Sequence, residues 1–230
     1  MHKVLLANQA ELLQLIDSFE QNDELAMEVM RNIGQTGVQE AFYDELLRRA
    51  HNYLSAVKML VDHTRNLVRD YGDHPFAIEY RDRVADLMRS GRAPLLQKLR
   101  DYLLHYRIPP FGVHIRVESG SALTSTIYMD RDAALEFKDW PLLARSYLEQ
   151  QPEKVPLGTL IQEYAAELEV LYRWLYDRFF ELHRQDIAGY NELLVASQGP
   201  QNTPGHPDYR PFEPPPSEGK TVVPPERRRP

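Results

Sequence analysis

The chain has 230 residues, of which 43% are hydrophobic and 27% are charged, a balance typical of a soluble globular protein. It contains no cysteine, which excludes disulfides, thiolate catalysis, iron–sulfur clusters and cysteine-ligated zinc. Its net charge of −7 argues against nucleic-acid binding as a property of the whole surface.

The apolar segments of the chain are short. No apolar run approaches the roughly 20 residues that a helix needs to span a bilayer. Residues 1–8 turn polar too soon for the core of a signal peptide. We therefore expect a cytoplasmic protein without a membrane-embedded part, and the lack of cysteine also suits a reducing compartment.

Apolar residues recur at helical spacing through the first third of the chain. The pattern predicts a helix over 8–33, broken near Asn22 and Asp23, and a long helix over 38–71. Two apolar files on the long helix form a broad seam, typical of a helix packed against two neighbours. They are Leu46, Ala50, Tyr53, Val57, Leu60, Thr64, Leu67 and Tyr71, and Leu47, Leu54, Val61 and Val68.

Two shorter helices and a hairpin follow. The helices are predicted over about 76–89 and from Pro94 to about Arg107, where two prolines stop the second one. Apolar and polar residues then alternate, which predicts a β-hairpin over about 111–129 with its turn at 119–121. An isolated hairpin is marginal in water, so this one must pack on the helices or extend the sheet of a partner.

The second half of the chain is again predicted to be helical. Asp130 or Asp132 is expected to cap a short helix over 132–138. Another helix covers about 140–150. A second long helix, over about 157–185, is expected to pack beside the one at 38–71. Its extra aromatics Tyr172, Trp174, Tyr176 and Phe180 are interpreted as core or dimer contacts rather than a base-binding site.

Residues 198–230 have a different composition. Ten of these 33 residues are proline, and the segment has too little apolar surface to offset the entropy of ordering it. It is predicted to be a disordered tail, and its triple proline at 214–216 is a candidate polyproline ligand for a protein partner. The fold expected from the whole chain is mostly α: residues 1–197 form a helical bundle with two long helices and a hairpin insertion, followed by this tail.

Positive charge gathers in one segment. Residues 81–116 hold eight basic and three acidic side chains, a local charge of 8 − 3 = +5. The basic residues are Arg81, Arg83, Arg89, Arg92, Lys98, Arg100, Arg107 and Arg116. Two interpretations stay open: ordinary solvated helix faces, or a local anion-binding surface.

The common catalytic motifs are missing from the sequence. It has no glycine-rich phosphate loop, no G-x-S-x-G and no H-E-x-x-H. No acid stands three residues before His51, His63, His105 or His183, so a ferritin-like carboxylate site is not predicted.

Residues 99–106 carry the one pattern that suggests chemistry. Arg100 and His105 form an R-x4-H arrangement with the polar Asp101 directly after the arginine. Three other pairs have an allowed spacing of four to six. Arg69–His74 crosses a glycine and Arg107–His114 crosses two prolines. Arg178–His183 is expected to stay on its helix but has Phe179 in the second position.

The Arg100–His105 motif resembles that of the HEPN superfamily (higher eukaryotes and prokaryotes nucleotide-binding domains). Those proteins are helical bundles, many of them metal-independent ribonucleases of toxin–antitoxin, abortive-infection and CRISPR systems. Two protomers commonly pair there, so that both motifs line one cleft. The resemblance covers the motif and a helical plan over about 38–107; the hairpin and the helix at 157–185 lie outside the minimal family plan.

The resemblance implies a homodimer that acts on RNA without a metal or cofactor. His105 would be the acid/base and Arg100 the phosphate binder, with Asp101 orienting either of them. The candidate substrate-binding residues beside this motif are Lys98, Arg107, Arg65 and His63.

The chemistry is consistent, because a histidine exchanges protons near neutral pH and an arginine stabilises charge on a phosphate. Arg100 and His105 are nevertheless five residues apart, about 140° around a helix. Either a long arginine reaches across, or a second protomer completes the site, or the two residues only make surface hydrogen bonds. The alternative function is a non-catalytic helical interaction module whose proline-rich tail recruits a partner.

Overall fold

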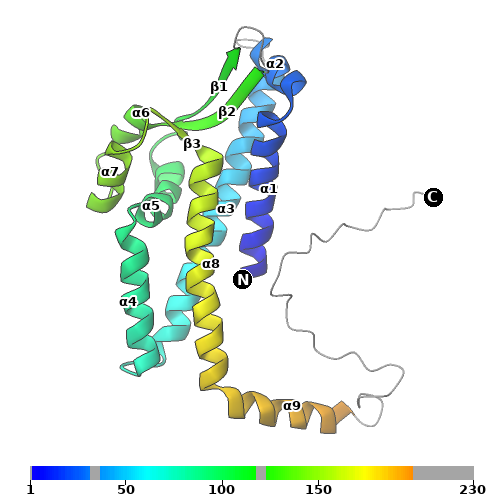
Figure 1. Cartoon of the computed structure of the whole chain (residues 1–230), viewed down its shortest axis with the longest axis vertical. Coiled ribbons are helices and arrows are strands. Elements are labelled where there is room, and N and C mark those ends of the chain that lie inside the picture. The colour runs from blue at the N-terminus through cyan, green and yellow to red at the C-terminus, as the bar shows by residue number, and fades with distance from the viewer. Residues whose placement is uncertain (1, 32–36, 118–122, 199–230) are drawn as a thin grey trace, which may run out of the picture. The chain divides into compact units, whose positions relative to one another are not determined.

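The computed structural model describes residues 2–31, 37–117 and 123–198 (Figure 1). The helices are α1 (His2–Glu20), α2 (Asp23–Arg31), α3 (Val38–Arg69), α4 (Pro75–Arg89), α5 (Arg92–His105), α6 (Arg131–Leu135), α7 (Leu142–Glu149), α8 (Leu157–Leu182) and α9 (Arg184–Gln198). The strands are β1 (Phe111–Val117), β2 (Leu123–Asp130) and β3 (Lys154–Pro156). The described chain is therefore mostly helical with one small sheet, as the sequence predicts.

The chain divides into two compact units, Met1–Tyr176 and Asp177–Pro230. Two predicted features fall outside the described residues: the hairpin turn at 119–121 and, apart from Gln198, the tail at 198–230. Gln198 itself is the last residue of α9. None of the helices in the described ranges is both long and apolar enough to cross a bilayer.

The first helix breaks where the sequence predicts. The side chain of Asn22 accepts a hydrogen bond from the backbone N–H of Leu25 at 3.1 Å, so Asn22 caps the start of α2. The first helix also begins earlier than expected, at His2. The reason is tertiary, because Leu5 is buried and the His2 ring stacks on Tyr172 of α8 at 5.8 Å.

The apolar seam predicted on α3 is the centre of the first unit. Leu46, Tyr53, Val57 and Leu60 are each 5% exposed or less, whereas Leu67 near the end of the helix is exposed. α3 packs against both α1 and α5, as a broad seam requires.

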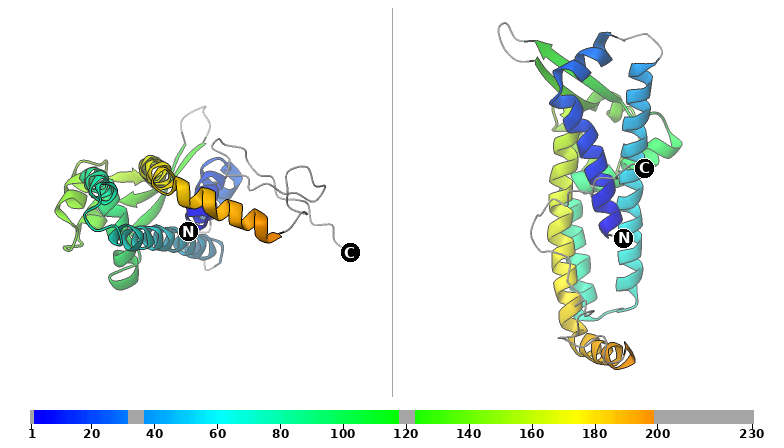
Figure 2. Two further views of the ribbon diagram at one scale, coloured as in Figure 1. Left: turned by 90° about the horizontal axis from the view of Figure 1, so that it is seen from below. Right: turned by 90° about the vertical axis from the view of Figure 1, so that its right-hand side faces the viewer.

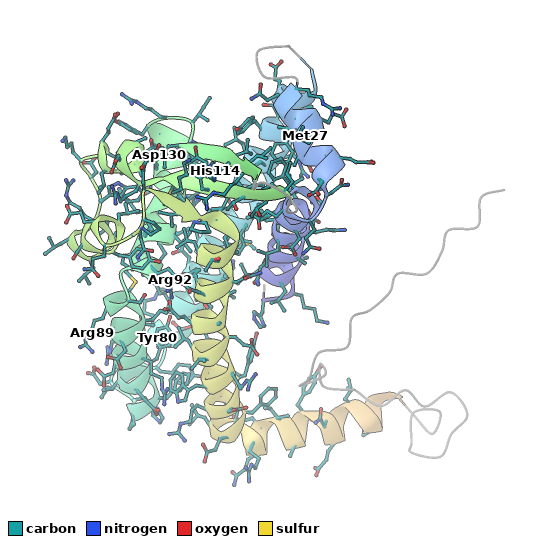
Figure 3. All side chains as sticks on the ribbon, turned by 45° about the horizontal axis from the view of Figure 1, so that its top comes forward. Met27, Tyr80, Arg89, Arg92, His114 and Asp130 are labelled. Atoms are coloured by element: carbon teal, nitrogen blue, oxygen red, sulfur yellow. The ribbon has the colours of Figure 1, made fainter. Side chains whose placement is uncertain are left out.

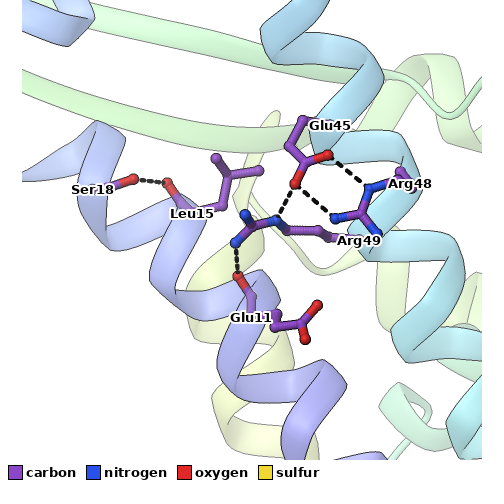
Figure 4. A network of polar contacts seen from close by, with 6 residues as sticks. All are labelled: Glu11, Leu15, Ser18, Glu45, Arg48 and Arg49. Carbon is purple, nitrogen blue, oxygen red and sulfur yellow. Dashed lines mark hydrogen bonds and ion pairs between the residues drawn. The ribbon is translucent and has the colours of Figure 1, made fainter. Parts of the chain in front are cut away.

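Polar side chains also join α3 to α1 (Figure 4). The carboxylate of Glu45 accepts hydrogen bonds from Arg48 at 2.7 Å and from Arg49 at 2.6 Å. Arg49 in turn donates to the backbone carbonyl of Glu11 on α1 at 2.5 Å. These bonds hold the pKa of Glu45 at about 2, well below its usual value.

The predicted hairpin is confirmed, with β1 and β2 antiparallel and Phe111 opposite Met129. It packs on the helices, because Ser125 donates to the carbonyl of Phe19 at 3.0 Å and the N–H of Ile127 donates to Glu20 at 2.9 Å. A third strand, β3, which the sequence analysis did not predict, pairs with β2. Three residues are too few to show a strand periodicity.

The sheet continues directly into α6. Asp130, at the end of β2 (Figure 3), accepts a hydrogen bond from the N–H of Ala133 at 2.9 Å. Of the two predicted capping residues, Asp130 is therefore the one that caps the helix.

The long helix α8 contacts several earlier helices of the first unit. Thr64 of α3 and Tyr172 of α8 share a buried hydrogen bond of 3.0 Å, which confirms the predicted packing of α8 beside α3. Trp174 donates to Glu79 of α4 at 2.8 Å. Figure 2 shows α8 also running alongside α1, where Gly158 approaches Ile16.

The second unit holds the end of α8 and α9. α8 ends at Leu182, three residues before the predicted end, and α9 continues through Gly189. Large apolar side chains of this second unit are exposed, including Phe180 of α8 at 55% and Tyr190 and Leu193 of α9 at 64% and 71%.

Candidate functional site

The helix α5 that carries the Arg–His motif is held firmly at its start. Gly91, with φ of 74°, precedes it, and Arg92 is paired with both Glu163 and Glu167 of α8 at 2.5 Å. Leu95, Leu99 and Tyr102 form its buried face. Tyr106 lies beyond the end of the helix and is 40% exposed.

Arg100 lies half-buried on α5. Its side chain is 30% exposed, and one terminal nitrogen stands 3.7 Å from a carboxylate oxygen of Asp101. Its Nε is buried and has no hydrogen-bond partner among the described residues. A buried donor without a partner costs free energy, and the terminal nitrogens of the partly exposed guanidinium are the ones that a ligand could reach.

Asp101 brings two of the predicted cations together. Its carboxylate lies 3.7 Å from Arg100 and 3.4 Å from Lys98. Lys98 also stands over the ring of Phe137 at 5.8 Å. The Asp101 carboxylate is therefore shared between the two cations.

His105 is the last residue of α5 and is exposed to solvent. Within the described chain, no hydrogen bond or ion pair joins His105 to Arg100 or Asp101. This agrees with their positions about 140° apart around the helix. One copy of the chain therefore does not bring the predicted acid/base and the predicted phosphate binder into contact.

Arg107 follows the helix and is paired with an acid from another element. It donates to Glu136 at 2.8 Å, and its guanidinium also stands over the ring of Tyr106 at 5.0 Å. A phosphate at Arg107 would have to compete with the Glu136 carboxylate.

The two candidates on α3 lie in a different setting. His63 is exposed. Arg65 stands 4.0 Å from Asp62 and lines a pocket between α3 and α4 that neither Arg100 nor His105 lines. The structure thus groups Lys98, Arg100 and Asp101, and it places Arg65 at another site.

The other three Arg–His pairs differ from the motif on α5. His74 caps α4 after α3 has ended at Arg69, and His114 lies in β1. The prediction that Arg178 and His183 share a helix is wrong, because α8 ends at Leu182. His183 starts the turn into α9, where it lies 3.1 Å from Asp186. Arg100–His105 is the pair whose two residues share one helix.

The positive segment is largely neutralised by acids from outside it. Arg92, which Figure 3 labels, pairs with Glu163 and Glu167, and Arg107 pairs with Glu136. Further pairs are Arg81 with Asp73 and Arg83 with Glu79. Of the two interpretations left open, paired helix faces describe this segment better than one continuous anion-binding surface.

Arg69 and Arg81 line the same α3–α4 pocket as Arg65, although neither was predicted as a site residue. The spacing of Arg65, Val68 and Arg69 puts these residues on one helix face and was visible in the sequence. The sequence did not show that the turn between α3 and α4 brings Arg81 next to Arg65 and Arg69.

No group of three or more histidine, aspartate or glutamate side chains in the described part of the chain is arranged to hold a metal ion.

Comparison with protein-family models, with curated proteins and with solved structures gives no match.

Proposed function

We propose that the protein is a HEPN-like, metal-independent ribonuclease or RNA-binding protein that acts as a homodimer in the cytoplasm. A role in a toxin–antitoxin or phage-defence system belongs to the same proposal. One observation carries it: Arg100 and His105 share one helix, with the histidine exposed in the last turn and the side chain of the arginine 30% exposed beside Asp101.

The proposed roles follow from the chemistry of RNA cleavage. The 2′-hydroxyl oxygen attacks the neighbouring phosphorus, and the 5′-oxygen leaves with a proton. His105 exchanges the protons, since one nitrogen of a neutral imidazole accepts a proton and the other donates one. Arg100 binds the phosphate and stabilises the charge that develops on it. Asp101, 3.7 Å from Arg100, is a positioning residue for the guanidinium.

The second copy has a specific part in this proposal. Because Arg100 and His105 point to different sides of α5, we expect Arg100 of one protomer to act with His105 of the other. A twofold dimer forms two such sites.

The test compares RNA cleavage by the wild-type chain, Arg100→Ala and His105→Ala. Both variants should lose at least about a hundredfold in rate, with little change in thermal stability. Arg178→Ala is the matched control, because it removes the arginine of a pair with the same spacing but not on one helix. Intact RNA with the wild-type chain, or equal cleavage by all the variants, would rule the enzyme out.

Mixing the two inactive variants tests the shared site. A mixed dimer would contain one complete Arg100–His105 pair, so an equal mixture should recover roughly a quarter of the wild-type rate. If both groups act within one protomer, the mixture stays inactive.

A non-catalytic interaction module is the second candidate. Tyr190 and Leu193 favour it, because they are 64% and 71% exposed and stand three residues apart on one face of α9. In this module the proline-rich tail recruits the partner, so deleting residues 198–230 should leave RNA cleavage unchanged under the first proposal and abolish partner recruitment under this one.

A further inference from the structure

A pocket of about 410 Å³ lies where α3 ends and α4 begins. Each helix contributes one face to it. Arg65, Val68 and Arg69 stand at positions i, i+3 and i+4 on α3, and Ala77, Tyr80 and Arg81 repeat this spacing on α4. Residues at this spacing share one side of a helix, so the turn between α3 and α4 brings two arginine-bearing faces together.

The pocket has an apolar floor and a charged rim. Val68, Ala77 and Tyr80 are buried, with 6% exposure or less. The side chains of Arg65 and Arg81 are 52% and 57% exposed, so their guanidinium groups remain within reach of a ligand. Burial raises the pKa of the Tyr80 phenol, and the positive charge of Arg65 opposes this. The phenol is therefore neutral at pH 7 and available as a hydrogen-bond donor.

The rim holds more positive than negative charge. Three arginines and one carboxylate, Asp73, line the pocket, which gives 3 − 1 = +2. The Asp73 carboxylate is 99% exposed and stands 3.6 Å from Arg81. Arg65 has a distant pair with Asp62 at 4.0 Å, and Arg69 makes no ion pair with any described residue. These contacts satisfy the three guanidinium groups only in part.

We propose that the α3–α4 pocket binds a small anion that carries phosphate, with a diphosphate group as the best match to its charge. Arginine forks bind phosphate oxygens in pairs, and a pocket of this volume falls in the range of small-ligand sites. A basic residue in the last turn of a helix also offsets the helix dipole. That effect accounts for Arg69 on α3, but Arg81 comes from the following helix and is not explained by it.

The pocket is independent of the proposed ribonuclease site, because no residue of α5 lines it. Arg100→Ala and His105→Ala should therefore leave binding to the pocket unchanged. Failure of one proposal is distinguishable from failure of the other.

The experiment titrates the full-length chain with pyrophosphate by calorimetry at low ionic strength, where exposed charges are least screened. One site per chain is expected. Arg69→Ala and Arg81→Ala should each weaken binding about tenfold, as loss of a charge-assisted hydrogen bond does. Arg173→Ala, which removes an exposed, paired arginine on α8, is the matched control and should bind as the wild-type chain does.

Asp73→Asn gives the sharper test, because it should strengthen pyrophosphate binding whereas the arginine variants weaken it. The Asp73 carboxylate competes with the ligand for Arg81, so its neutralisation should tighten binding several-fold. The proposal is overturned if pyrophosphate does not bind the wild-type chain, or if the Arg69 and Arg81 variants bind it as well as the control does. Weaker binding by Asp73→Asn would also overturn it.

A competition with ADP identifies the source of the phosphate. Tighter binding of ADP would indicate a nucleotide, and tighter binding of pyrophosphate would indicate the inorganic anion; both support the site. An RNA oligonucleotide that binds through Arg69 and Arg81 while neither small anion does would overturn the proposal in favour of a polymer.

Discussion

The chain turns twice around α4: at a first corner, between α3 and α4, and at a second corner, between α4 and α5. The two corners have similar sequences, but side chains pack around them differently. Each has a glycine with positive φ, Gly72 at 53° before α4 and Gly91 at 74° after it, and each has arginines close by. At the second corner Arg92 is paired with Glu163 and Glu167, and a Cβ on Gly91 would meet Tyr147 at 2.6 Å. At the first corner a Cβ on Gly72 would meet nothing within 4 Å.

This difference shows what decides whether a group of arginines is structural or open to a ligand. Arginines lie at both corners. What differs is how many carboxylates reach them and how much solvent is excluded. Arg92 is 17% exposed and has two glutamate partners, whereas Arg81 is 57% exposed and has one solvent-exposed aspartate. The closed corner fixes α5, and the open corner leaves a pocket.

The glycines provide the largest expected contrast. Gly91→Ala should destabilise the fold by about 3 kcal/mol, from positive φ and from overpacking against Tyr147 and the carbonyl of Leu143, 2.7 Å away. Gly72→Ala has only the backbone penalty, about 1 kcal/mol. For a chain of this size the first change corresponds to roughly 6–12 °C in Tm, which calorimetry measures. Equal losses in the two variants would mean that the corners are packed alike.

The arginines give the next contrast. Arg92→Ala leaves Glu167, which is 27% exposed, without its cation and should cost about 2 kcal/mol. Arg69→Ala removes an exposed side chain and should change the free energy of unfolding by less than about 0.5 kcal/mol. Urea unfolding followed by circular dichroism compares the two. A large loss for Arg69→Ala would show that it holds the first corner closed.

The smallest expected change in stability concerns the solvent-facing ion pairs that Glu45 of α3 makes with Arg48 and Arg49. Arg48 and Arg49 keep the pKa of Glu45 at about 2 in the folded chain, below its ordinary value of 4.5. A lowered pKa means that the carboxylate adds stability above pH 4.5 and loses it as the pH falls toward 2. Glu45→Gln should therefore cost less than about 1 kcal/mol at pH 7, since the groups face water.

The measurement for Glu45 is urea unfolding of the wild-type chain and Glu45→Gln between pH 7 and pH 3. The difference in stability should narrow below pH 4.5. Glu149→Gln, which leaves the bridge between α1 and α3 intact, controls for the loss of an exposed carboxylate. A difference that stays constant with pH would contradict the assignment.

The sequence predicted the helices and the hairpin well because their signals are local. The apolar seam of α3, the break near Asn22 and the alternation in β1 each lie within a few residues of the structure that they specify. β3 was not predicted, because its strand character comes from pairing with β2, about 25 residues earlier in the sequence. The end of α8 at Leu182 was also placed three residues too late, since no glycine or proline between Leu182 and Gly189 marks it.

For the candidate site, too, the sequence predicted the local relations and not the contacts between elements. The sequence placed Arg100, Asp101 and His105 on one helix, and their spacing alone set the two key residues about 140° apart. It did not show that Arg107 is paired with Glu136, nor that Arg65 belongs with Arg69 and Arg81. Those relations depend on residues from other elements.

The sequence by itself thus determined which segments are helices and strands and which residues of α5 share a helix, because backbone periodicity and capping act over a few residues. Only the tertiary structure decided which arginines are paired with carboxylates and which remain open to a ligand. The acids that pair with Arg92 lie 71 and 75 residues further along the chain. Coulomb attraction and burial depend on distance through space, so the closed corner and the open one differ only once the helices are packed.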